Sequence, residues 1–372
     1  MKLNIALLPG DGIGPEVTAQ AKKVLKAIAM EFNHKFTFKD ALVGACAIDK
    51  TGNPLPDETL KLCKNYDAVL FGAIGDPKYD NDPDAKVRPE QGLLKLRKEL
   101  GLFANIRPVK AYETLLGKSP LKKHSIEGTD ICIYRELTGG IYFGEKKLSE
   151  DGNTASDLCE YSRFEIERIA HLAFKAAQSR NKKVTLIDKA NVLESSRLWR
   201  KVVTEIAIKY PDVTLEFLFV DNAAMQMILN PKQFDVILTE NMFGDIISDE
   251  ASVIGGSIGL LASASIGEKY AMFEPIHGSY PQATGKGIAN PIASILSAAM
   301  LLEHFGLFDE ADLIKKGVDK SLKLYITTPD LNTKYDTITT SKVGDFIEDF
   351  ISHPKDTNLN FKNIHLGQST II

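Results

Sequence analysis

Three aspartates in the second half of the chain have the type and spacing expected of ligands for a hard metal ion. Asp245 and Asp249 lie four residues apart in FGDIISDEAS, so a helix would place both carboxylates on one face. Like charges at this spacing repel each other, and a bound Mg²⁺ or Mn²⁺ would remove the repulsion because these ions prefer oxygen ligands. Asp221 closes the apolar run VTLEFLFV, a predicted strand, and open α/β sheets bind ligands beyond their strand ends. A solvated surface face is the alternative that spacing alone leaves open.

Three arginines beside short apolar runs could bind the carboxylates of a small di-acid. They are Arg97 in LLKLRKELG, Arg107 in FANIRPVK and Arg135 in ICIYRELTGG. A guanidinium group can hold a carboxylate through two parallel hydrogen bonds, which suits arginine to such substrates. Each arginine alone is equally compatible with a structural ion pair. Only the convergence of all three would indicate a binding site, and the sequence does not show convergence.

Two further residues could carry protons. Tyr142 lies among glycines and aromatic residues in GGIYFGE, and Lys189 follows the apolar run VTLID. Nearby positive charge, or desolvation in the case of the lysine, would lower the pKa of either group toward neutrality. A core tyrosine with a satisfied hydroxyl and a solvated lysine are the alternative interpretations.

Two glycine-rich segments could bring their backbone close to a nucleotide. Residues 10–15 (GDGIGP) match neither the dinucleotide fingerprint nor the phosphate-binding P-loop, so a tight turn is the plainer interpretation. Residues 273–291 (FEPIHGSYPQATGKGIANP) offer backbone amides and His277, and they lead directly into an apolar helix. This second segment favours a nucleotide cradle, with a surface loop as the alternative.

The elements that must position these residues alternate along the chain. Strands are expected at 3–8, 36–43, 67–73, 102–109, 130–134, 184–188, 213–220 and 235–239. Helices are expected at 15–31, 91–100, 162–180, 194–209, 242–254, 290–306, 310–325 and 342–352. This alternation predicts an α/β protein with a largely parallel sheet. The polar, proline-rich residues 75–90 are expected to form a long functional loop.

Composition argues against several classes of function. The 372 residues carry a formal net charge of −4 and no basic tract, so neither nucleic acid nor a membrane surface is an expected partner. We find no apolar stretch of spanning length and no signal-peptide core at the N-terminus, which predicts a cytoplasmic protein. The four cysteines lack paired spacing and are expected to be reduced, mostly buried thiols rather than disulfides or zinc ligands.

Taken together, these segments resemble the isocitrate/isopropylmalate dehydrogenase family of metal-dependent decarboxylating dehydrogenases. The resemblance runs from residue 4 to about residue 305. It rests on six segments in order: LLPGDGIGPEV, LLKLRKELGLFANIRPVK, RELTGGIYFGE, DKANVLESSRLWR, ENMFGDIISDEAS and EPIHGSYPQATGKGIANP. It implies two lobes that share a continuous mixed sheet flanked by helices, which is not a Rossmann fold. The implied domains are a discontinuous cofactor-binding domain, 1–102 plus 255–372, and a central domain, 103–254, that forms a dimer.

The resemblance also implies a role for each candidate residue. The implied substrate carboxylate ligands are Arg97, Arg107 and Arg135, and the implied Mg²⁺ or Mn²⁺ ligands are Asp221, Asp245 and Asp249. Lys189 would take the proton of the substrate hydroxyl, and Tyr142 would help to protonate the enol. Because Lys189 and Asp221 enter the neighbouring site in this family, the resemblance implies a homodimer with shared active sites.

Leu93 and Leu94 match the pattern of the family members that accept an isopropyl group. The implied reaction is oxidative decarboxylation of (2R,3S)-3-isopropylmalate to 4-methyl-2-oxopentanoate and CO₂ in leucine biosynthesis. Val192 and Asp221 are further implied substrate contacts. A related enzyme acting on isocitrate, homoisocitrate or tartrate is the nearest alternative. A non-catalytic regulatory subunit should have lost a metal-binding or proton-carrying residue, and this chain retains all of them; a phosphate-binding nucleotide module would rest on GDGIGP alone.

NAD is the implied cofactor. Its implied contacts lie mainly near the two glycine-rich segments: Ile13, Ala73, Ile74, Glu90, Glu274, His277, Gly278, Ser279, Tyr280, Gln282, Ala283, Gly285 and Asn290. NAD-using members usually carry an acidic residue where this chain has Gln282. A neutral amide repels a 2′-phosphate less than a carboxylate does, so we expect weaker discrimination against NADP.

Overall fold

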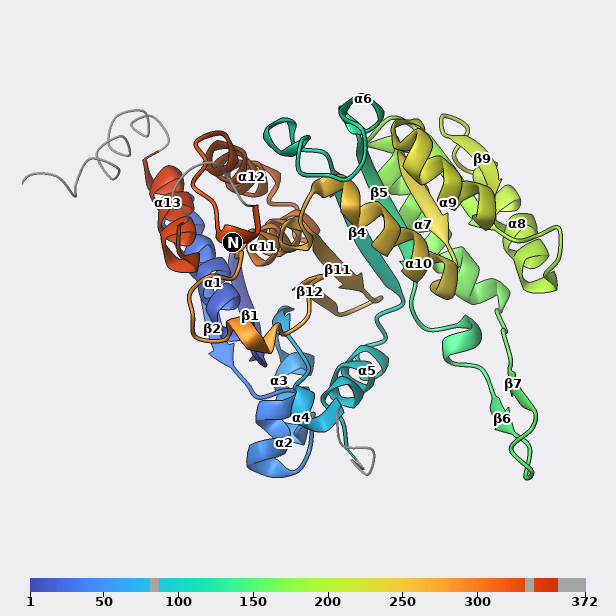
Figure 1. The fold of residues 1–372 in the computed structure, drawn as a ribbon, viewed down its shortest axis with the longest axis horizontal. Helices are drawn as coiled ribbons and strands as arrows, with labels where there is room; N and C mark the ends of the chain where they lie inside the picture. Colours follow the sequence, from blue (N-terminus) through green and yellow to red (C-terminus); the bar gives the residue numbers. More distant parts are fainter. Residues whose placement is uncertain (81–86, 332–337, 354–372) are drawn as a thin grey trace, which may run out of the picture.

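A ten-stranded sheet extends through both halves of the molecule (Figure 1). The structure is a computed structural model that describes residues 1–80, 87–331 and 338–353. Its strands are β1 (Lys2–Gly10), β2 (Lys35–Asp40), β3 (Ala68–Ala73), β4 (Ala104–Lys110), β5 (Asp130–Glu136), β8 (Lys183–Asp188), β9 (Thr214–Phe219), β10 (Val236–Thr239), β11 (Ala262–Ile266) and β12 (Ala271–Pro275). They lie in the order β2-β1-β3-β12-β11-β4-β5-β10-β8-β9.

The sheet is mixed, with parallel strands in its two outer parts and antiparallel strands in its centre. The pairs β12–β11, β11–β4 and β4–β5 are antiparallel, whereas the other neighbouring pairs are parallel. This confirms the continuous mixed sheet implied by the family resemblance. The sheet has more antiparallel pairing at its centre than the simple alternation of elements predicts.

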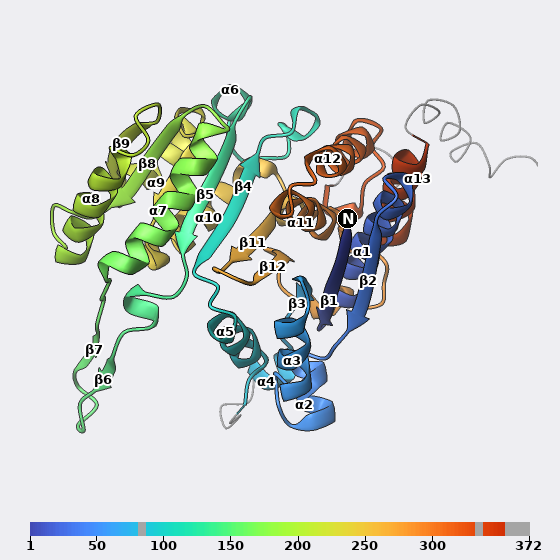
Figure 2. The same ribbon diagram turned by 180° about the vertical axis from the view of Figure 1, so that it is seen from behind.

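Helices cover both faces of the sheet (Figures 1 and 2). One face is covered by α1 (Gly14–Glu31), α7 (Arg163–Gln178), α8 (Glu194–Ala207), α11 (Ile292–His304), α12 (Phe308–Lys323) and α13 (Thr340–Ser352). The other face is covered by α2 (Ala45–Thr51), α3 (Asp57–Asn65), α5 (Pro89–Glu99), α9 (Val220–Leu229) and α10 (Asn241–Ser252). Two short helices, α4 (Pro77–Asp80) and α6 (Lys123–Ile126), lie in connections.

The apolar runs of the sequence explain this layering. In β1, Ile5 and Leu7 pack into the core beneath α1, whereas Ala6 and Leu8 pack into the core on the opposite face. Successive side chains of a strand point to opposite faces, so a strand covered on both sides must be apolar at nearly every position. Residues 3–8 (LNIALL) meet this requirement almost throughout.

Several elements were not predicted from the sequence. Strand β11 reads ASASI, and its small residues carry little β-strand signal, although the strand is buried along its whole length. Residues 273–275, part of the predicted nucleotide segment 273–291, belong to β12 instead.

Two predicted positions are corrected by the structure. Strand β9 ends at Phe219, so Asp221 lies in the first turn of α9 rather than at the end of a strand. The prediction of one loop over 75–90 is wrong at its ends, where α4 and the start of α5 lie, and residues 81–86 are outside the described residues.

A two-stranded ribbon projects from the body of the molecule (Figures 1 and 2). It consists of β6 (Lys146–Leu148) and β7 (Ala155–Asp157), whose residues are all exposed. The four cysteines are free thiols, as predicted, but only Cys63 and Cys132 are buried, whereas Cys46 and Cys159 are partly exposed. Within the described ranges, we find no helix that combines the length and the apolar character needed to cross a membrane.

Candidate active site

The predicted pair of aspartates lies on one face of α10. Arg107 reaches this face from β4, and its Nη1 donates a hydrogen bond to Asp249 Oδ1 at 3.0 Å. Arg107 Nη2 lies 3.9 Å from Asp245 Oδ1. Both carboxylates therefore face the same guanidinium group, which offsets the repulsion that their spacing creates. The helical prediction for these two residues is confirmed.

The three arginines converge. Arg135 on β5 forms an ion pair with Asp245, and it donates two hydrogen bonds to Asn241 Oδ1, from Nε at 3.2 Å and from Nη2 at 2.9 Å. Burial, followed by the positive charge of Arg107, lowers the pKa of Arg135 to about 10. Burial also lowers the pKa of Arg107, and the charge of Arg97 acts in the same direction on both groups. Such an accumulation of buried positive charge suits a ligand with more than one carboxylate.

Arg97 connects the arginine cluster with the predicted nucleotide segment. It lies on α5, and its Nη2 donates to Glu274 Oε1 on β12 at 2.7 Å. Glu274 is almost fully buried, so this pair ties α5 to the centre of the sheet. Arg97 Nε is buried and has no hydrogen-bond partner within the described residues. The predicted substrate residue Arg97 and the predicted cofactor residue Glu274 are thus direct neighbours.

Tyr142 lies at the open side of this cluster. Its hydroxyl donates to Asp245 Oδ2 at 3.1 Å, and its side chain is 44% exposed. Burial and the nearby Asp245 carboxylate raise the pKa of Tyr142, so the predicted lowering of its pKa is wrong for this structure. The preceding Gly140 has a φ of +73°, and a Cβ there would lie 2.3 Å from the Tyr161 hydroxyl. Glycine is therefore required where the Tyr142 segment crosses Tyr161.

Lys189 and Asp221 pair with each other rather than with this cluster. Lys189 Nζ donates to Asp221 Oδ1 at 2.6 Å, and this contact lowers the pKa of Asp221. The neighbouring Val192 is exposed. Across the described parts of the chain, no three His, Cys, Asp or Glu side chains come close enough to hold a metal ion. One chain therefore presents two separate groups of predicted residues.

The chemistry of Asp245 and Asp249 fits a divalent cation. Their oxygens are hard ligands, their side chains are 37% and 71% exposed, and both face the same space beside Arg107. Two carboxylates from one helix leave the remaining ligand positions to other oxygens. Asp221 is such a ligand only if a second copy of the chain brings it there.

The segment after β12 fits a nucleotide through its open backbone and through one buried ring nitrogen. A Cβ at Gly278 or Gly285 would meet nothing within 4 Å, so the backbone there is accessible to a ligand. His277 Nε2 is buried without a hydrogen-bond partner in the part of the chain that the structure describes. Burial lowers the pKa of His277, which favours a neutral ring that could bind an adenine. Tyr280 and Gln282 are exposed on the same segment.

Other predicted cofactor residues are buried in or near this segment. Ile13 and Ala283 are buried in one small apolar cluster, and the Ile13 N–H donates to Ser279 O at 2.8 Å. Asn290 is also buried, where its Nδ2 donates to Asp330 Oδ2 at 3.0 Å. Ala73 is buried, and its carbonyl accepts a hydrogen bond from the Asp11 N–H at 2.9 Å. The Ile13 backbone therefore holds the nucleotide segment at Ser279, and the side chains of these four residues are buried in this structure.

Glu90 and Ser279 both lie close to Gly75, the first residue of the predicted functional loop. A Cβ at Gly75 would lie 3.0 Å from Glu90 Oε1 and 3.5 Å from Ser279 Oγ. The start of α5 and the nucleotide segment therefore meet at this point. Leu93, which follows on α5, packs against the same apolar core as Ile74. This packing is a further contact between α5 and the residues just before Gly75.

Leu94 differs from its neighbour Leu93. Its side chain is 53% exposed, whereas Leu93 packs against a core. A large exposed apolar side chain beside an arginine cluster is a suitable contact for an aliphatic group of a ligand. The two leucines predicted to act together therefore differ in exposure in this structure.

Asp11 is an organising residue that the sequence analysis missed. Its carboxylate accepts backbone hydrogen bonds from Ala45, Cys46 and Gly75 at 2.8, 2.9 and 3.0 Å. Burial raises the pKa of Asp11, and these three donors oppose the rise. The GDGIGP segment is the predicted tight turn, since Gly12 has a φ of +58° and a Cβ there would meet Ser279 O at 2.0 Å. An acidic residue between two glycines after a strand was the available signal.

Asn241 was missed as well. Its Oδ1 accepts from Arg135, its Nδ2 donates to Gly139 O at 3.2 Å, and its backbone N–H donates to the Tyr161 hydroxyl at 2.9 Å. One side chain therefore fixes Arg135 and the segment that leads to Tyr142. The sequence offers no signal for this role beyond a polar residue at the start of a helix.

Comparison with known proteins agrees with this geometry. The family model described as isocitrate/isopropylmalate dehydrogenase matches residues 4–347. The chain is 56% identical to a 3-isopropylmalate dehydrogenase of Bacteroides fragilis over 352 residues, which cover 94% of this chain and 99% of that protein. It is also 56% identical to the 3-isopropylmalate dehydrogenase of Bacillus subtilis over 337 residues, covering 89% and 92% of the two chains.

Solved structures show the same fold at lower identity. An isocitrate dehydrogenase from Methylococcus capsulatus has a TM-score of 0.83 at 35% identity and covers 94% of this chain and 99% of that chain. A beta-decarboxylating dehydrogenase from Thermococcus kodakarensis has a TM-score of 0.80 at 36% identity, with coverage of 96% and 99%. The similarity in fold therefore extends across nearly the whole length of each protein.

Proposed function

The chain belongs to the isocitrate/isopropylmalate dehydrogenase family, and on this premise we propose that it is an NAD-dependent 3-isopropylmalate dehydrogenase. It would oxidise (2R,3S)-3-isopropylmalate and decarboxylate it to 4-methyl-2-oxopentanoate and CO₂, a step of leucine biosynthesis that we place in the cytoplasm. The observation that carries this proposal is the convergence of Arg97, Arg107 and Arg135 beside Asp245 and Asp249. This arrangement suits a hydroxy-diacid.

Each group of side chains has a separate role in the proposed reaction. Arg97, Arg107 and Arg135 would hold the two carboxylates of the substrate and fix its orientation. A divalent cation held by the aspartates would polarise the 2-hydroxyl and stabilise negative charge on its oxygen. Lys189 would accept the hydroxyl proton while the hydride at C2 passes to NAD. After CO₂ leaves, the hydroxyl of Tyr142 would deliver a proton to C3.

We propose a homodimer in which each site takes Lys189 and Asp221 from the partner. Support comes from the separation of these two residues from Asp245 and Asp249 within one chain. Further support comes from large apolar side chains that stay exposed on or just after α9 and α10. They are Met225, Ile228, Leu229, Ile246 and Val253. Side chains of this kind gathered on neighbouring helices are typical of a surface that another protein covers.

The division into lobes, 1–102 plus 255–372 and 103–254, remains part of the proposal. The packing of the cores supports it. The two cores that contain α1, α11 and α5 draw almost all of their residues from the first lobe. The two cores that contain α7, α8 and α10 draw theirs from the central lobe. Substrate would bind between the lobes, since Arg97 comes from the first and Arg135 from the second.

NADH formation with 3-isopropylmalate, measured with and without Mg²⁺, tests the proposed reaction directly. We expect the kcat/KM for 3-isopropylmalate to exceed that for isocitrate by about tenfold or more, because burial of the isopropyl group is worth roughly 1.5–3 kcal/mol. Replacing the exposed Leu94 with Ser should lower kcat/KM for 3-isopropylmalate by about tenfold. Met30→Ser, at an exposed position on α1, is the matched control. A preference for isocitrate in the unmodified protein would overturn the substrate assignment.

Cofactor choice is expected to depend on Gln282. The unmodified enzyme should use NAD better than NADP, and Gln282→Asp should lower kcat/KM with NADP by about tenfold, because a carboxylate repels the 2′-phosphate. Gln282 is exposed, so this change should leave the fold intact. Thr284→Asp, at another exposed position of the same segment, separates a local effect from a general change in charge. Tighter binding of NADP than of NAD by the unmodified protein would contradict the assignment.

A further inference from the structure

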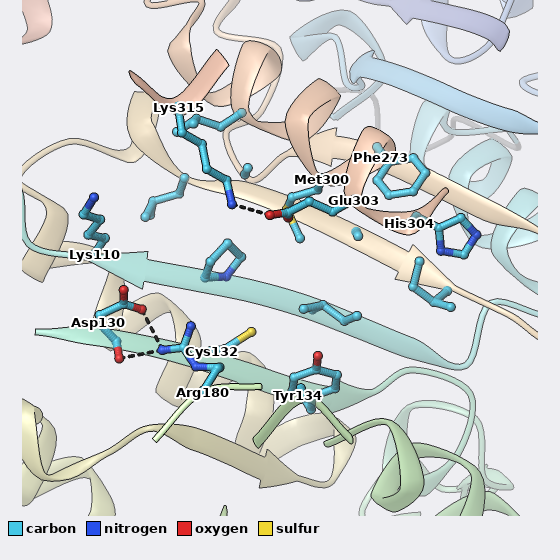
Figure 3. A pocket seen from close by; sticks show the side chains of 18 of the residues that line it. Lys110, Asp130, Cys132, Tyr134, Arg180, Phe273, Met300, Glu303, His304 and Lys315 are labelled. Carbon is cyan, nitrogen blue, oxygen red and sulfur yellow. Dashed lines mark hydrogen bonds and ion pairs between the residues drawn. The ribbon is translucent and has the colours of Figure 1, made fainter. Parts of the chain in front are cut away.

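A cavity of about 840 Å³ lies on the face of the sheet opposite the arginine cluster (Figure 3). Strands β4, β5, β11 and β12 form its floor, with α7 as one wall and α11 and α12 as the other. Alternation along β4 and β5 separates it from the candidate active site. Arg107 and Arg135 point toward α10, whereas Ile106 on β4 and Cys132 on β5 point into the cavity. The cavity is therefore distinct from the site described above.

Charged side chains line one end of the cavity, and aromatic side chains line the other. In Figure 3, Lys110, Asp130 and Arg180 gather toward one end, whereas Tyr134 and His304 lie toward the other. His304 packs edge-on against Phe273, with ring centroids 5.7 Å apart. Burial lowers the pKa of His304, which favours a neutral ring beside Phe273. An occupant should therefore have one polar and one apolar end.

Four cations and three anions line the cavity, and Arg180 also pairs with Asp235, which is buried outside the lining. Three of the cations are matched by anions, in the pairs Arg180–Asp130, Lys110–Asp319 and Lys315–Glu303. Lys175 on α7 also lines the cavity, but it has no ion pair with any described residue. Lys175 is exposed, so its ammonium group is free to meet a ligand from solvent. An anionic head group is favoured over a cationic one.

The cavity also lies where the two main cores of the molecule meet. Ile106 on its floor and Leu172 on its α7 wall each pack against both of these cores. Small-molecule sites occur preferentially at such junctions, and they are mostly apolar cavities of about 300–1,000 Å³ with a few polar groups. Phe308, exposed at the start of α12, adds an uncovered apolar side chain to the wall.

We propose that this cavity binds an amphipathic carboxylate of the fatty-acid type. Its apolar chain would lie toward Tyr134 and Phe273, and its carboxylate would pair with Lys175 on the α7 wall. The ligand would contact α7 and α12 together and so bridge the two sides of the molecule. This site would be spatially separate from the substrate and nucleotide residues, because it lies on the opposite face of the sheet.

Calorimetric titration of the full chain with decanoate, below its micellar concentration, tests this proposal. Lys175→Glu should weaken decanoate binding by about fivefold or more, because it reverses the unpaired charge. Lys61→Glu makes the same change in charge at an exposed position on α3, which covers the opposite face of the sheet, and it should leave binding unchanged. Ala176→Phe should abolish binding by filling the space beside α7.

Melting temperatures and turnover of the three variants, measured without decanoate, serve as the check on folding. The cation decyltrimethylammonium has the same apolar tail. It should bind at least tenfold more weakly than decanoate, because Lys175 repels its positive charge. Equal binding of the two amphiphiles would overturn the proposal. So would decanoate binding that Lys175→Glu and Lys61→Glu affect equally, or that persists in a folded Ala176→Phe protein.

Discussion

Replacing Lys189 with Met is expected to lower kcat by about 10²- to 10⁴-fold, the usual contribution of a positioned acid–base group. Methionine keeps most of the apolar stem of lysine but cannot accept the hydroxyl proton. Lys189 is paired with the exposed Asp221 at 2.6 Å, so its loss should not disturb a core. Steady-state kinetics with 3-isopropylmalate, together with NADH binding by fluorescence, would separate a chemical defect from a binding defect. Wild-type kcat in this variant would remove Lys189 from the mechanism.

The same variant tests whether two chains share each site. Inactive Lys189→Met protein is mixed with inactive Asp249→Asn protein under conditions that exchange subunits. In a mixed dimer, one site would receive an intact Asp249 from one chain and an intact Lys189 from the other. Random exchange makes about half of the dimers mixed, each with one of two sites intact, so about a quarter of wild-type activity should return.

A second mixture provides the control for this experiment. Lys189→Met and Asp221→Asn alter residues that the structure places in one contact, and that would enter the same neighbouring site together. No mixed dimer of these two variants contains an intact site, so activity should not return. Recovery in this control, or no recovery with Asp249→Asn, would contradict the shared-site proposal.

Helices and strands with a strong local pattern were predicted well from the sequence, and the candidate site shows why. Asp245 and Asp249 share a helix face because their spacing matches one helical turn, which is a local property. Segments with strong apolar periodicity, such as β1 and α7, were predicted within a few residues of their observed ends. Strand β11 was missed because its burial depends on neighbours far away in the sequence rather than on its own small residues.

Convergence is what the sequence alone leaves undetermined. Arg107 and Arg135 meet because β4 and β5 pair in an antiparallel register that places both side chains on the same face. Asp11 reaches Gly75 across 64 positions of the chain, and no local pattern encodes this contact. The predicted direction of the Tyr142 pKa shift was also wrong, since burial and then Asp245, a residue 103 positions away, raise this pKa. Interactions set by tertiary pairing require the structure.

Removal of divalent cations is expected to stop turnover, and Mg²⁺ or Mn²⁺ should restore it. Asp249→Asn should lower kcat/KM by about 10³-fold, since the polarising effect of a bound cation is worth several kcal/mol. The side chain of Arg107 would still be held by Ser248 at 2.7 Å and by Asn105 at 2.6 Å, so we expect this variant to fold. Asp312→Asn, which removes a surface carboxylate paired with Lys316, is the matched control.

The pairing of arginines with aspartates gives this experiment a second readout. Arg107 and Arg135 are bound to Asp249 and Asp245 in this structure, yet the same guanidinium groups are needed for the substrate. A cation that takes the aspartates would release the arginines, so cation and substrate should bind with positive coupling. The melting temperature of the unmodified protein should therefore rise more with Mg²⁺ and 3-isopropylmalate together than the two separate shifts would add up to. Asp249→Asn should lose this additional rise in melting temperature, whereas Asp312→Asn should keep it. Full turnover in the presence of a chelator would exclude the role of the cation.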